Sequence, residues 1–253
     1  MSRTVIFHYH LFKNAGTSVD QVLKENFGER WVTREFTNKP AKLHAQEVAQ
    51  WVQDNPEALA FSSHTAELPL PEVEGVEFIP VIYVRQPLDR IASAYAFETK
   101  QGGAGFGAVL ARNTSLAGYV EVRLSMPRDR QCRNFQSSRF ARMFAAEGGT
   151  EREQALKAAQ ALPFIGVVED FAGSMNRLEA LLKPHFPDFK VRHVAANVSR
   201  DLSLGMDERL AQLRQKLGDA VFEQVRAANE DDEALYQAVC ARFLTPAEAP
   251  AQA

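Results

Sequence analysis

Apolar residues along this chain form short continuous runs that alternate with longer stretches of helical spacing. The clearest runs begin at Val5 and at Phe78, and each is followed by a turn and an amphipathic stretch. Short runs of this kind are typical of strands buried in a parallel sheet. The alternation predicts an α/β fold with three layers, α/β/α, around a central, mostly parallel sheet.

The remaining elements continue this order. The first helix is predicted to end at Gly28, and Pro87 is well placed as the first residue of a later helix. The glycine-rich segment 102–107 predicts a flexible break, followed by helical patterns up to residue 147. We predict one domain over 1–244 and a disordered tail over 245–253. Further strands are expected at 31–36, 58–64, 164–168 and 190–194, and further helices at 41–54, 151–162, 172–182 and 206–243.

The turn after the first apolar run has the features of an anion site. Lys13 supplies positive charge, and Gly16 lets the backbone approach a ligand closely. Thr17 and Ser18 offer hydroxyls at the start of a helix, where unpaired amides and the helix dipole favour an anion. A Walker A motif instead has Lys directly before the Ser or Thr that holds magnesium. We therefore expect a phosphate-like or sulfate-like group bound without a metal; an ordinary turn capped by Thr17 is the alternative.

A second candidate anion site follows the run that begins at Phe78. Arg85 stands at the carboxyl end of this predicted strand, where open α/β sheets bind ligands. Ser93 lies two turns along the next helix, and an Arg can hold a phosphate by paired charge-assisted hydrogen bonds. A single Arg at a strand end is usually a surface ion-pair partner. Two such sites at strand-to-helix junctions favour one ligand with two anionic groups.

These segments together resemble the sulfotransferases that use 3′-phosphoadenosine-5′-phosphosulfate (PAPS). The likeness is greatest to the carbohydrate branch, with heparan- and chondroitin-type enzymes and their bacterial relatives. In that family a loop like 10–18 binds the 5′-phosphosulfate, and a segment like 85–95 binds the 3′-phosphate. Segments 132–139, 164–171 and 197–200 are also similar, so the likeness covers residues 4–243. The resemblance implies a P-loop-like fold and nucleotide contacts from Lys13, Asn14, Ala15, Gly16, Thr17, Ser18, Arg85, Ser93 and Arg200.

Two residues depart from the family pattern. Phe12 stands where the family usually has Pro, and Gln86 where an acidic residue or Asn is commoner. Neither change removes a positively charged side chain, so we expect nucleotide binding to be kept.

The resemblance also implies the chemistry, an in-line transfer of a sulfuryl group to an acceptor hydroxyl. Lys13 would neutralise charge on the phosphate–sulfate bridge, because preorganised donors act where charge develops. His64 ends a predicted strand and is the candidate base, since histidine is mostly neutral near pH 7 and can accept a proton. Glu67 is the alternative base, and a surface or capping role for His64 is the alternative reading.

Charge patterning gives a weaker indication of the acceptor. Seven arginines and two acidic residues lie between positions 112 and 142. Such a local excess can steer an anionic acceptor such as a uronic-acid glycan, or it can be a solvated helix face. We expect Arg139 and Glu67 to contact the acceptor. The segment 102–107 would form a mobile lid beside it.

His8 and His10 alternate on the first strand and suggest a metal pair. Neither has a Cys or carboxylate neighbour in the sequence, so we expect no metal site here. His8 is then a packed or hydrogen-bonded residue, and His10 lines the mouth of the nucleotide site.

Composition excludes several other classes of protein. The net charge of −3 over 253 residues argues against a nucleic-acid binder. Two widely separated cysteines favour reduced thiols. No apolar run approaches the roughly 18 residues of a membrane span, and the chain starts directly on its first strand, so we expect a bacterial, cytoplasmic protein.

Two rival functions stay open on the sequence. A P-loop kinase or NTPase would share the strand–loop–helix start, and 167–170 resembles a metal-binding acidic strand end. A catalytically silent nucleotide- or glycan-binding module would bind PAPS without transferring sulfate. The acceptor also stays open between a glycan, a lipid-linked sugar and a small hydroxyl metabolite.

Overall fold

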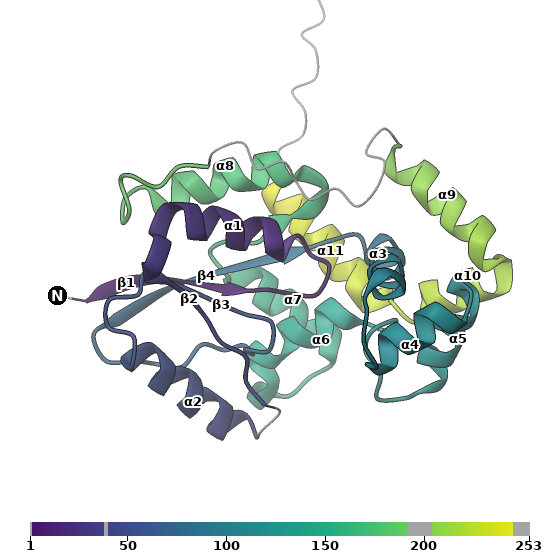
Figure 1. Ribbon diagram of the computed structural model, residues 1–253, viewed down its shortest axis with the longest axis horizontal. Coiled ribbons are helices and arrows are strands. Elements are labelled where there is room, and N and C mark those ends of the chain that lie inside the picture. The colour runs from purple at the N-terminus through teal and green to yellow at the C-terminus, as the bar shows by residue number, and fades with distance from the viewer. Residues whose placement is uncertain (1, 38–39, 192–203, 245–253) are drawn as a thin grey trace, which may run out of the picture.

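A five-stranded parallel sheet forms the centre of the molecule (Figure 1). The computed structural model describes residues 2–37, 40–191 and 204–244. The strand order is β2-β3-β1-β4-β5, so the chain passes from β1 to the edge strand β2, returns to β3 beside β1, and then crosses to β4 and β5 on the other side of β1. The predicted α/β fold with a parallel sheet is confirmed. The strands are β1 (Arg3–Tyr9), β2 (Trp31–Thr33), β3 (Ala60–Ser63), β4 (Val76–Val84) and β5 (Gly166–Val167).

Helices cover both faces of the sheet, with α1 and α8 on one face and α2, α6 and α7 on the other (Figure 1). The remaining helices lie beside and behind it. The helices are α1 (Gly16–Phe27), α2 (Ala41–Gln53), α3 (Pro87–Lys100), α4 (Phe106–Asn113), α5 (Leu116–Ser125), α6 (Phe135–Ala141), α7 (Glu151–Ala161), α8 (Phe171–Leu182), α9 (Met206–Leu217), α10 (Asp219–Ala227) and α11 (Glu230–Phe243).

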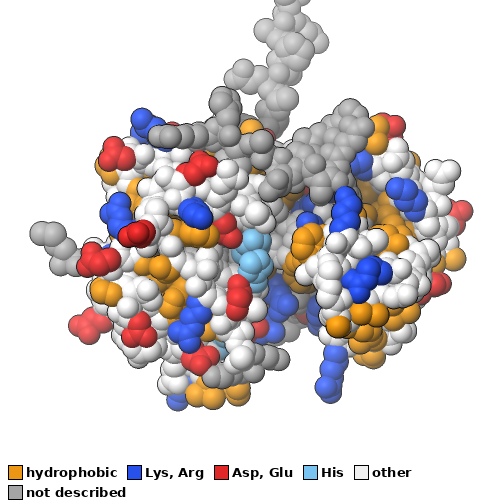
Figure 2. Space-filling view, viewed as in Figure 1, with side chains coloured by type: hydrophobic (Ala, Val, Ile, Leu, Met, Phe, Trp, Pro, Cys, Tyr) orange, Lys and Arg blue, Asp and Glu red, His pale blue; other side chains and the backbone are white. Residues whose placement is uncertain are grey.

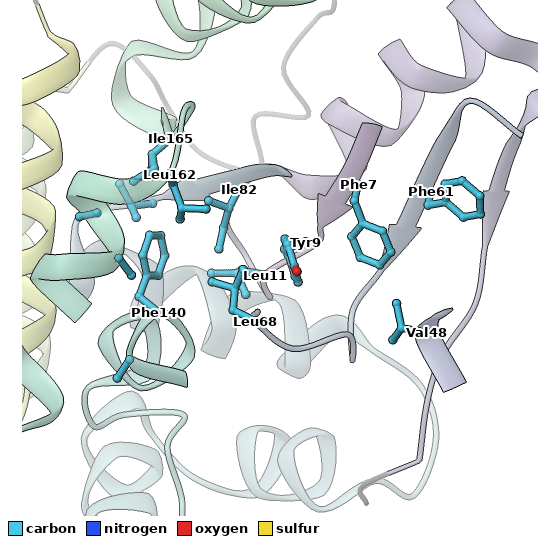
Figure 3. Close-up of a cluster of buried hydrophobic side chains, with 14 of the residues drawn as sticks. Phe7, Tyr9, Leu11, Val48, Phe61, Leu68, Ile82, Phe140, Leu162 and Ile165 are labelled. Carbon is cyan, nitrogen blue, oxygen red and sulfur yellow. The ribbon is translucent and has the colours of Figure 1, made fainter. Parts of the chain in front are cut away.

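Strand β1 divides its side chains between two cores, because successive strand residues point to opposite faces. Phe7 and Tyr9 pack with Trp51 of α2 in the core shown in Figure 3. Ile6 packs on the other face with Leu23 of α1. His8 and His10 share the face of Ile6, so both rings lie on the α1 side of the sheet.

A third core joins helices outside the sheet. Leu88 and Ile91 of α3 pack with Tyr119 of α5, Leu217 of α9 and Val225 of α10. Helices α4, α5 and α6 confirm the helical patterns predicted between the glycine-rich segment and residue 147. This helical part stands beside the carboxyl ends of the strands and forms one wall of the site described below.

Several element boundaries differ from the sequence prediction. The strand expected at 31–36 ends at Thr33, and the one at 164–168 shrinks to two residues because a 3₁₀ turn begins at Val168. The helix expected at 206–243 is three helices, broken at Gly218, whose φ is 75°, and at Asn229. Residues 190–191 are not in a strand, and 192–194 and the tail at 245–253 lie outside the described residues.

Candidate functional site

The carboxyl ends of β1, β3 and β4 meet at one edge of the sheet. Strand β1 lies between the other two, so the loops after them are neighbours at the point where the strand order reverses. Figure 2 shows a groove between the sheet side and the helical part, with histidine side chains on its wall and Lys and Arg side chains deeper in it. Lys13, His64 and Arg85 each follow one of these strands.

The loop after β1 is held in an unusual conformation. Lys13 and Ala15 have φ angles of 64° and 60°, which lie in the left-handed region. Such angles cost non-glycine residues about 1 kcal/mol or more each. Buried Asn14 pins the loop by donating to the Tyr83 carbonyl at 2.7 Å and to Gln136 Oε1 at 2.8 Å. The side chain of Asn14 is therefore used to fix the loop.

Helix α1 begins at Gly16, directly after this loop. Ala15 is the N-cap, and no side chain caps this end within the part of the chain that the structure describes. Thr17 lies inside the helix, so the alternative of an ordinary turn capped by Thr17 is wrong. Ser18 is buried and Thr17 is exposed. The amide end of α1 has the arrangement of an anion site.

Arg85 joins the second junction to the first. Its Nη1 donates to the Lys13 carbonyl at 3.1 Å, and its Nε and Nη2 donate to Asp89 Oδ2 at 2.8 and 2.6 Å. Gln136 of α6 adds a second link, because it exchanges two hydrogen bonds of 2.8 Å with the Arg85 backbone and also accepts from Asn14. The two predicted anion loops are therefore one connected unit.

Two further residues lie near Arg85 and Asp89: Ser93, further along α3, and Arg209 of α9. Ser93 is 1% exposed, and its Oγ has no hydrogen-bond partner among the described residues. Arg209 of α9 places Nη1 3.9 Å from Asp89 Oδ2. Arg209 is thus a third basic residue near the junction, whereas Arg200, the residue expected in that role, lies outside the described residues.

His64 follows β3 and is oriented by Glu35, which follows β2. The ring Nδ1 lies 2.7 Å from Glu35 Oε1, and the His64 amide also donates to this carboxylate. Burial alone would raise the pKa of Glu35, but hydrogen bonds from His64 and Thr65 lower it overall. An ionised Glu35 accepts a hydrogen bond from Nδ1–H, which leaves Nε2 of the half-exposed ring with a lone pair that can accept a proton. A base with an orienting carboxylate has the arrangement of general-base catalysis.

A pocket of about 260 Å³ opens beside His64 and also contains Glu67 and Arg139. The structure thus brings together the three acceptor-side residues that the sequence singled out. Glu67 is engaged by Arg142 in a short ion pair. One wall is apolar and is the edge of the core in Figure 3, where four of its residues are labelled: Tyr9, Leu11, Leu68 and Ile82.

Unlike Arg130 and Arg142, Arg139 forms no ion pair with any carboxylate in the described ranges. Its guanidinium lies 5.4 Å from the centroid of the Phe135 ring. Burial, together with nearby Arg142, lowers the pKa of Arg139. The charge of Arg139 is therefore available to a ligand in the pocket.

Most of the arginine-rich segment is engaged internally. Arg123 pairs with Glu98 and Asp129, and Arg130 pairs with Glu151. Arg112 donates to backbone carbonyls after α3. Carboxylates thus compensate part of the positive charge over 112–142, and of the two arginines that line the pocket, Arg142 is paired with Glu67 whereas Arg139 has no carboxylate partner among the described residues.

Asp20 of α1 binds both histidines of β1. Its two oxygens lie 2.8 Å from His8 Nδ1 and 2.7 Å from His10 Nδ1. The sequence argument that no carboxylate is near these histidines is therefore wrong, and the three side chains have ligand atoms within 4.8 Å of one another. Both N···O distances are those of hydrogen bonds, whereas two ligands of one ion at about 2.1 Å would stand about 3 Å or more apart. The absence of a metal stays a prediction.

Sequence reasoning did not single out Asp20, Glu35, Gln136 or Arg209 as site residues. Glu35 follows a predicted strand, so its place at a carboxyl end was a usable signal. Asp20 stands one turn into the helix, on the side that packs against the histidines. Gln136 lies in the segment 132–139 that the family resemblance covers, whereas Arg209 gave no comparable signal because its neighbours come from distant parts of the chain. Within the described ranges, no helix is both long and apolar enough to cross a membrane.

Comparison with known proteins identifies the family. The chain matches the family model described as "Sulfotransferase family" over residues 2–237. A protein of Archaeoglobus fulgidus named only as uncharacterized is 41% identical over 245 residues, which cover 94% of this chain and 97% of that protein. The family match spans nearly the whole chain and includes both connected loops and His64, so the family expected from the motifs is confirmed. The chain belongs to the sulfotransferase family.

Proposed function

We propose that this sulfotransferase moves the sulfuryl group of PAPS to a hydroxyl of a carbohydrate or a related acceptor. One observation carries the proposal: the Lys13 loop and Arg85 are directly hydrogen-bonded and lie beside a pocket that contains an oriented histidine. A donor with anionic groups at both ends needs two neighbouring anion sites, and the Lys13 loop and the Arg85 junction would be these two sites.

The donor would lie across the connected loops. The amide end of α1, with Lys13 and the hydroxyls of Thr17 and Ser18, suits the 5′-phosphosulfate. Arg85 and the buried, unpartnered Oγ of Ser93 suit the 3′-phosphate, since such an atom fits a ligand that supplies its hydrogen bond. The residues present therefore fit the donor, and no metal ligand is needed to account for these contacts.

The proposed reaction is a single displacement at sulfur. The acceptor oxygen bonds to sulfur while the bond from sulfur to the bridging oxygen breaks, and that electron pair stays on the 5′-phosphate. Lys13 offsets the charge that develops there, which is typically the largest catalytic contribution. Nε2 of His64 takes the acceptor proton, and Glu35 stabilises the resulting imidazolium. Glu67 is the weaker candidate for base, because its carboxylate already pairs with Arg142.

The pocket beside His64 supports an acceptor that carries an anionic group. Arg139 offers a cation without a carboxylate partner among the described residues, and Glu67 offers a hydrogen-bond acceptor for hydroxyls. The apolar wall of Leu68 and Ile82 suits the less polar face of a sugar ring or of another compact acceptor.

A thermal-shift titration tests the donor. A ligand that binds only the folded protein raises its melting temperature, by an amount set by concentration relative to Kd. We expect a shift with adenosine 3′,5′-bisphosphate and none with ATP plus magnesium. The opposite result would support the kinase alternative. Incubation with ³⁵S-labelled PAPS and a panel of glycan and small hydroxyl acceptors then separates an enzyme from a silent binding module.

A further inference from the structure

Asp20 is a partly buried carboxylate that accepts hydrogen bonds from two histidines at once. Its side chain is 16% exposed, while those of His8 and His10 are 1% and 10% exposed. Burial alone would raise the pKa of Asp20, but hydrogen bonds from His10 and His8 outweigh it and lower the pKa overall. Asp20 therefore carries a negative charge beside the His10 ring.

The opposite edge of the His10 ring lies against Gly16, in the loop that follows β1. A Cβ atom at Gly16 would come within 2.0 Å of His10 Cδ2 and 2.3 Å of Nε2. Only a glycine fits beneath the ring, and Gly16 is the first residue of α1. The Asp20 bond at Nδ1 thus directs the Cδ2–Nε2 edge of His10 to the place where the helix end offers its amides.

From these contacts we infer that His10 is a proton-dependent contact for the 5′ anionic group of the donor. Asp20 holds the ring through Nδ1, and the protonated ring donates its Nε2–H to an oxygen bound at the start of α1. This inference rests on the proposed function, because it assumes that the donor nucleotide binds this loop. It adds a charge that depends on pH to the fixed charge of Lys13.

Charged and titratable groups near His10 come from several elements. Asp20 binds it from α1, His8 of β1 lies beside it with ring centroids 5.4 Å apart, and Lys13 follows in the same loop. His64 stacks on it from the end of β3, with ring centroids 3.8 Å apart, and Glu35 lies behind His64.

Calorimetry with adenosine 3′,5′-bisphosphate across pH 5.5 to 8.5 tests the inference. His10→Gln keeps an N–H donor near the position of Nε2 but cannot take up a proton. We expect the Kd of His10→Gln to exceed that of the unchanged protein by roughly tenfold near pH 6, the effect of one charge-assisted bond, and the two to converge near pH 8.5. Because both proteins bind the same nucleotide, the ionisation of its own phosphates cancels in the ratio.

The controls separate this inference from the proposed function. His185→Gln removes an exposed histidine and should keep the pH dependence of the unchanged protein. A ratio that is the same at every pH overturns the role of His10 while leaving the donor site in place. Absence of nucleotide binding by the unchanged protein at any pH overturns the proposed function itself.

A second measurement needs no variant. Two-bond ¹H–¹⁵N imidazole spectra report which ring nitrogen carries the proton. For His10 we expect a proton on Nδ1 at high pH and protons on both nitrogens once adenosine 3′,5′-bisphosphate is added near pH 6. A neutral ring with its proton on Nε2, in the presence of the nucleotide, would contradict the inference.

Discussion

Each basic side chain at the groove is held by a partner from another part of the chain or from the next helical turn. Glu35 orients His64, Asp89 holds Arg85, and the ring of Phe97 lies 4.4 Å from Lys13 Nζ. Fixed orientation favours catalysis, because preorganised groups need no rearrangement as charge develops. At the scale of single residues, the site can therefore be tested by removing one group and leaving its support in place.

Lys13→Ala should leave the fold intact and reduce sulfuryl transfer by about 10²-fold or more, the scale of losing one preorganised donor. The link to Arg85 uses the Lys13 carbonyl and is kept in the variant. Initial rates with ³⁵S-PAPS and melting temperatures measure the two effects. Lys24→Ala, on an exposed turn of α1, is the matched control. Equal rates for the two variants would remove Lys13 from the chemistry.

His64→Ala should lower turnover by about 10²-fold while sparing nucleotide affinity, if His64 is the base. Glu67→Gln should have a smaller effect, because Glu67 is engaged with Arg142. Steady-state rates and calorimetry on the same preparations give both quantities. If His64→Ala turned over normally and Glu67→Gln did not, the base would be Glu67.

Arg85→Ala should weaken binding of adenosine 3′,5′-bisphosphate by about 1.5–3 kcal/mol, the scale of hydrogen bonds to a charged group. It also leaves Asp89, which is 2% exposed, without its closest cation, so some stability is lost as well. The double variant Arg85→Ala/Asp89→Asn removes the stranded charge and isolates the binding effect by calorimetry. Unchanged affinity in both variants would exclude Arg85 from the nucleotide site.

At the scale of elements, helix α6 connects the two loops that the proposed function uses. Gln136 is fully buried and serves the backbone of Arg85 and the side chain of Asn14. Its helix is held in turn by Asp232 of α11, which accepts from the Gln136 and Ser137 amides at 3.0 and 2.7 Å. The segment 132–139 therefore has a structural role behind the site as well as a place for Arg139 in the pocket.

Gln136→Leu tests this connection. The variant leaves the buried Arg85 N–H and C=O without their partner, which should lower the free energy of unfolding by about 2–5 kcal/mol. Urea denaturation measures the loss, and nucleotide affinity should fall with it because the loops are no longer joined. Ser138→Ala on the same helix is the control and should cost under about 1 kcal/mol, since among the described residues its Oγ bonds the Phe135 carbonyl alone. Equal losses would contradict a bridging role.

The sequence predicted those parts of the site that depend on local pattern. The apolar runs predicted β1 and β4, and their parallel pairing brought Lys13 and Arg85 to one edge, as a parallel sheet requires. The partners could not be predicted in the same way. Gln136 meets Arg85 across 51 positions, and Glu35 meets His64 across 29. Such contacts depend on how helices and loops pack, which periodicity does not specify.

At the scale of the whole molecule, the groove separates the sheet from a helical part that has its own core. The helices α3 and α9 lie beside Arg85, and α6 borders the pocket beside His64. Charge at the groove is paired across elements, as Asp20 of α1 shows with the two histidines of β1. The stability of the fold therefore depends on the protonation of groups that also serve the site.

Asp20 determines whether the free energy of unfolding rises or falls with pH in the acidic range. Its pKa is lowered in the folded protein, so it contributes stability above its unfolded value near 3.9, and that contribution is lost as pH falls below about 4. Asp20→Asn should therefore be less stable than the unchanged protein at pH 5, with a smaller difference at pH 3. Urea denaturation at the two pH values measures both differences. A difference that grew on acidification would contradict the assignment.

The hydrogen bond from Arg85 to the Lys13 carbonyl has a consequence for which donor is accepted. Because Asn14 and Gln136 join the same two loops, the spacing between the crevices is set by the protein and does not adjust to the ligand. A nucleotide without a 3′-phosphate would fill one crevice and leave the other hydrated. If the proposed function is right, this fixed separation lets the enzyme select a donor that carries both the 5′-phosphosulfate and the 3′-phosphate. Adenosine 5′-phosphosulfate, which lacks the 3′-phosphate, would then be rejected.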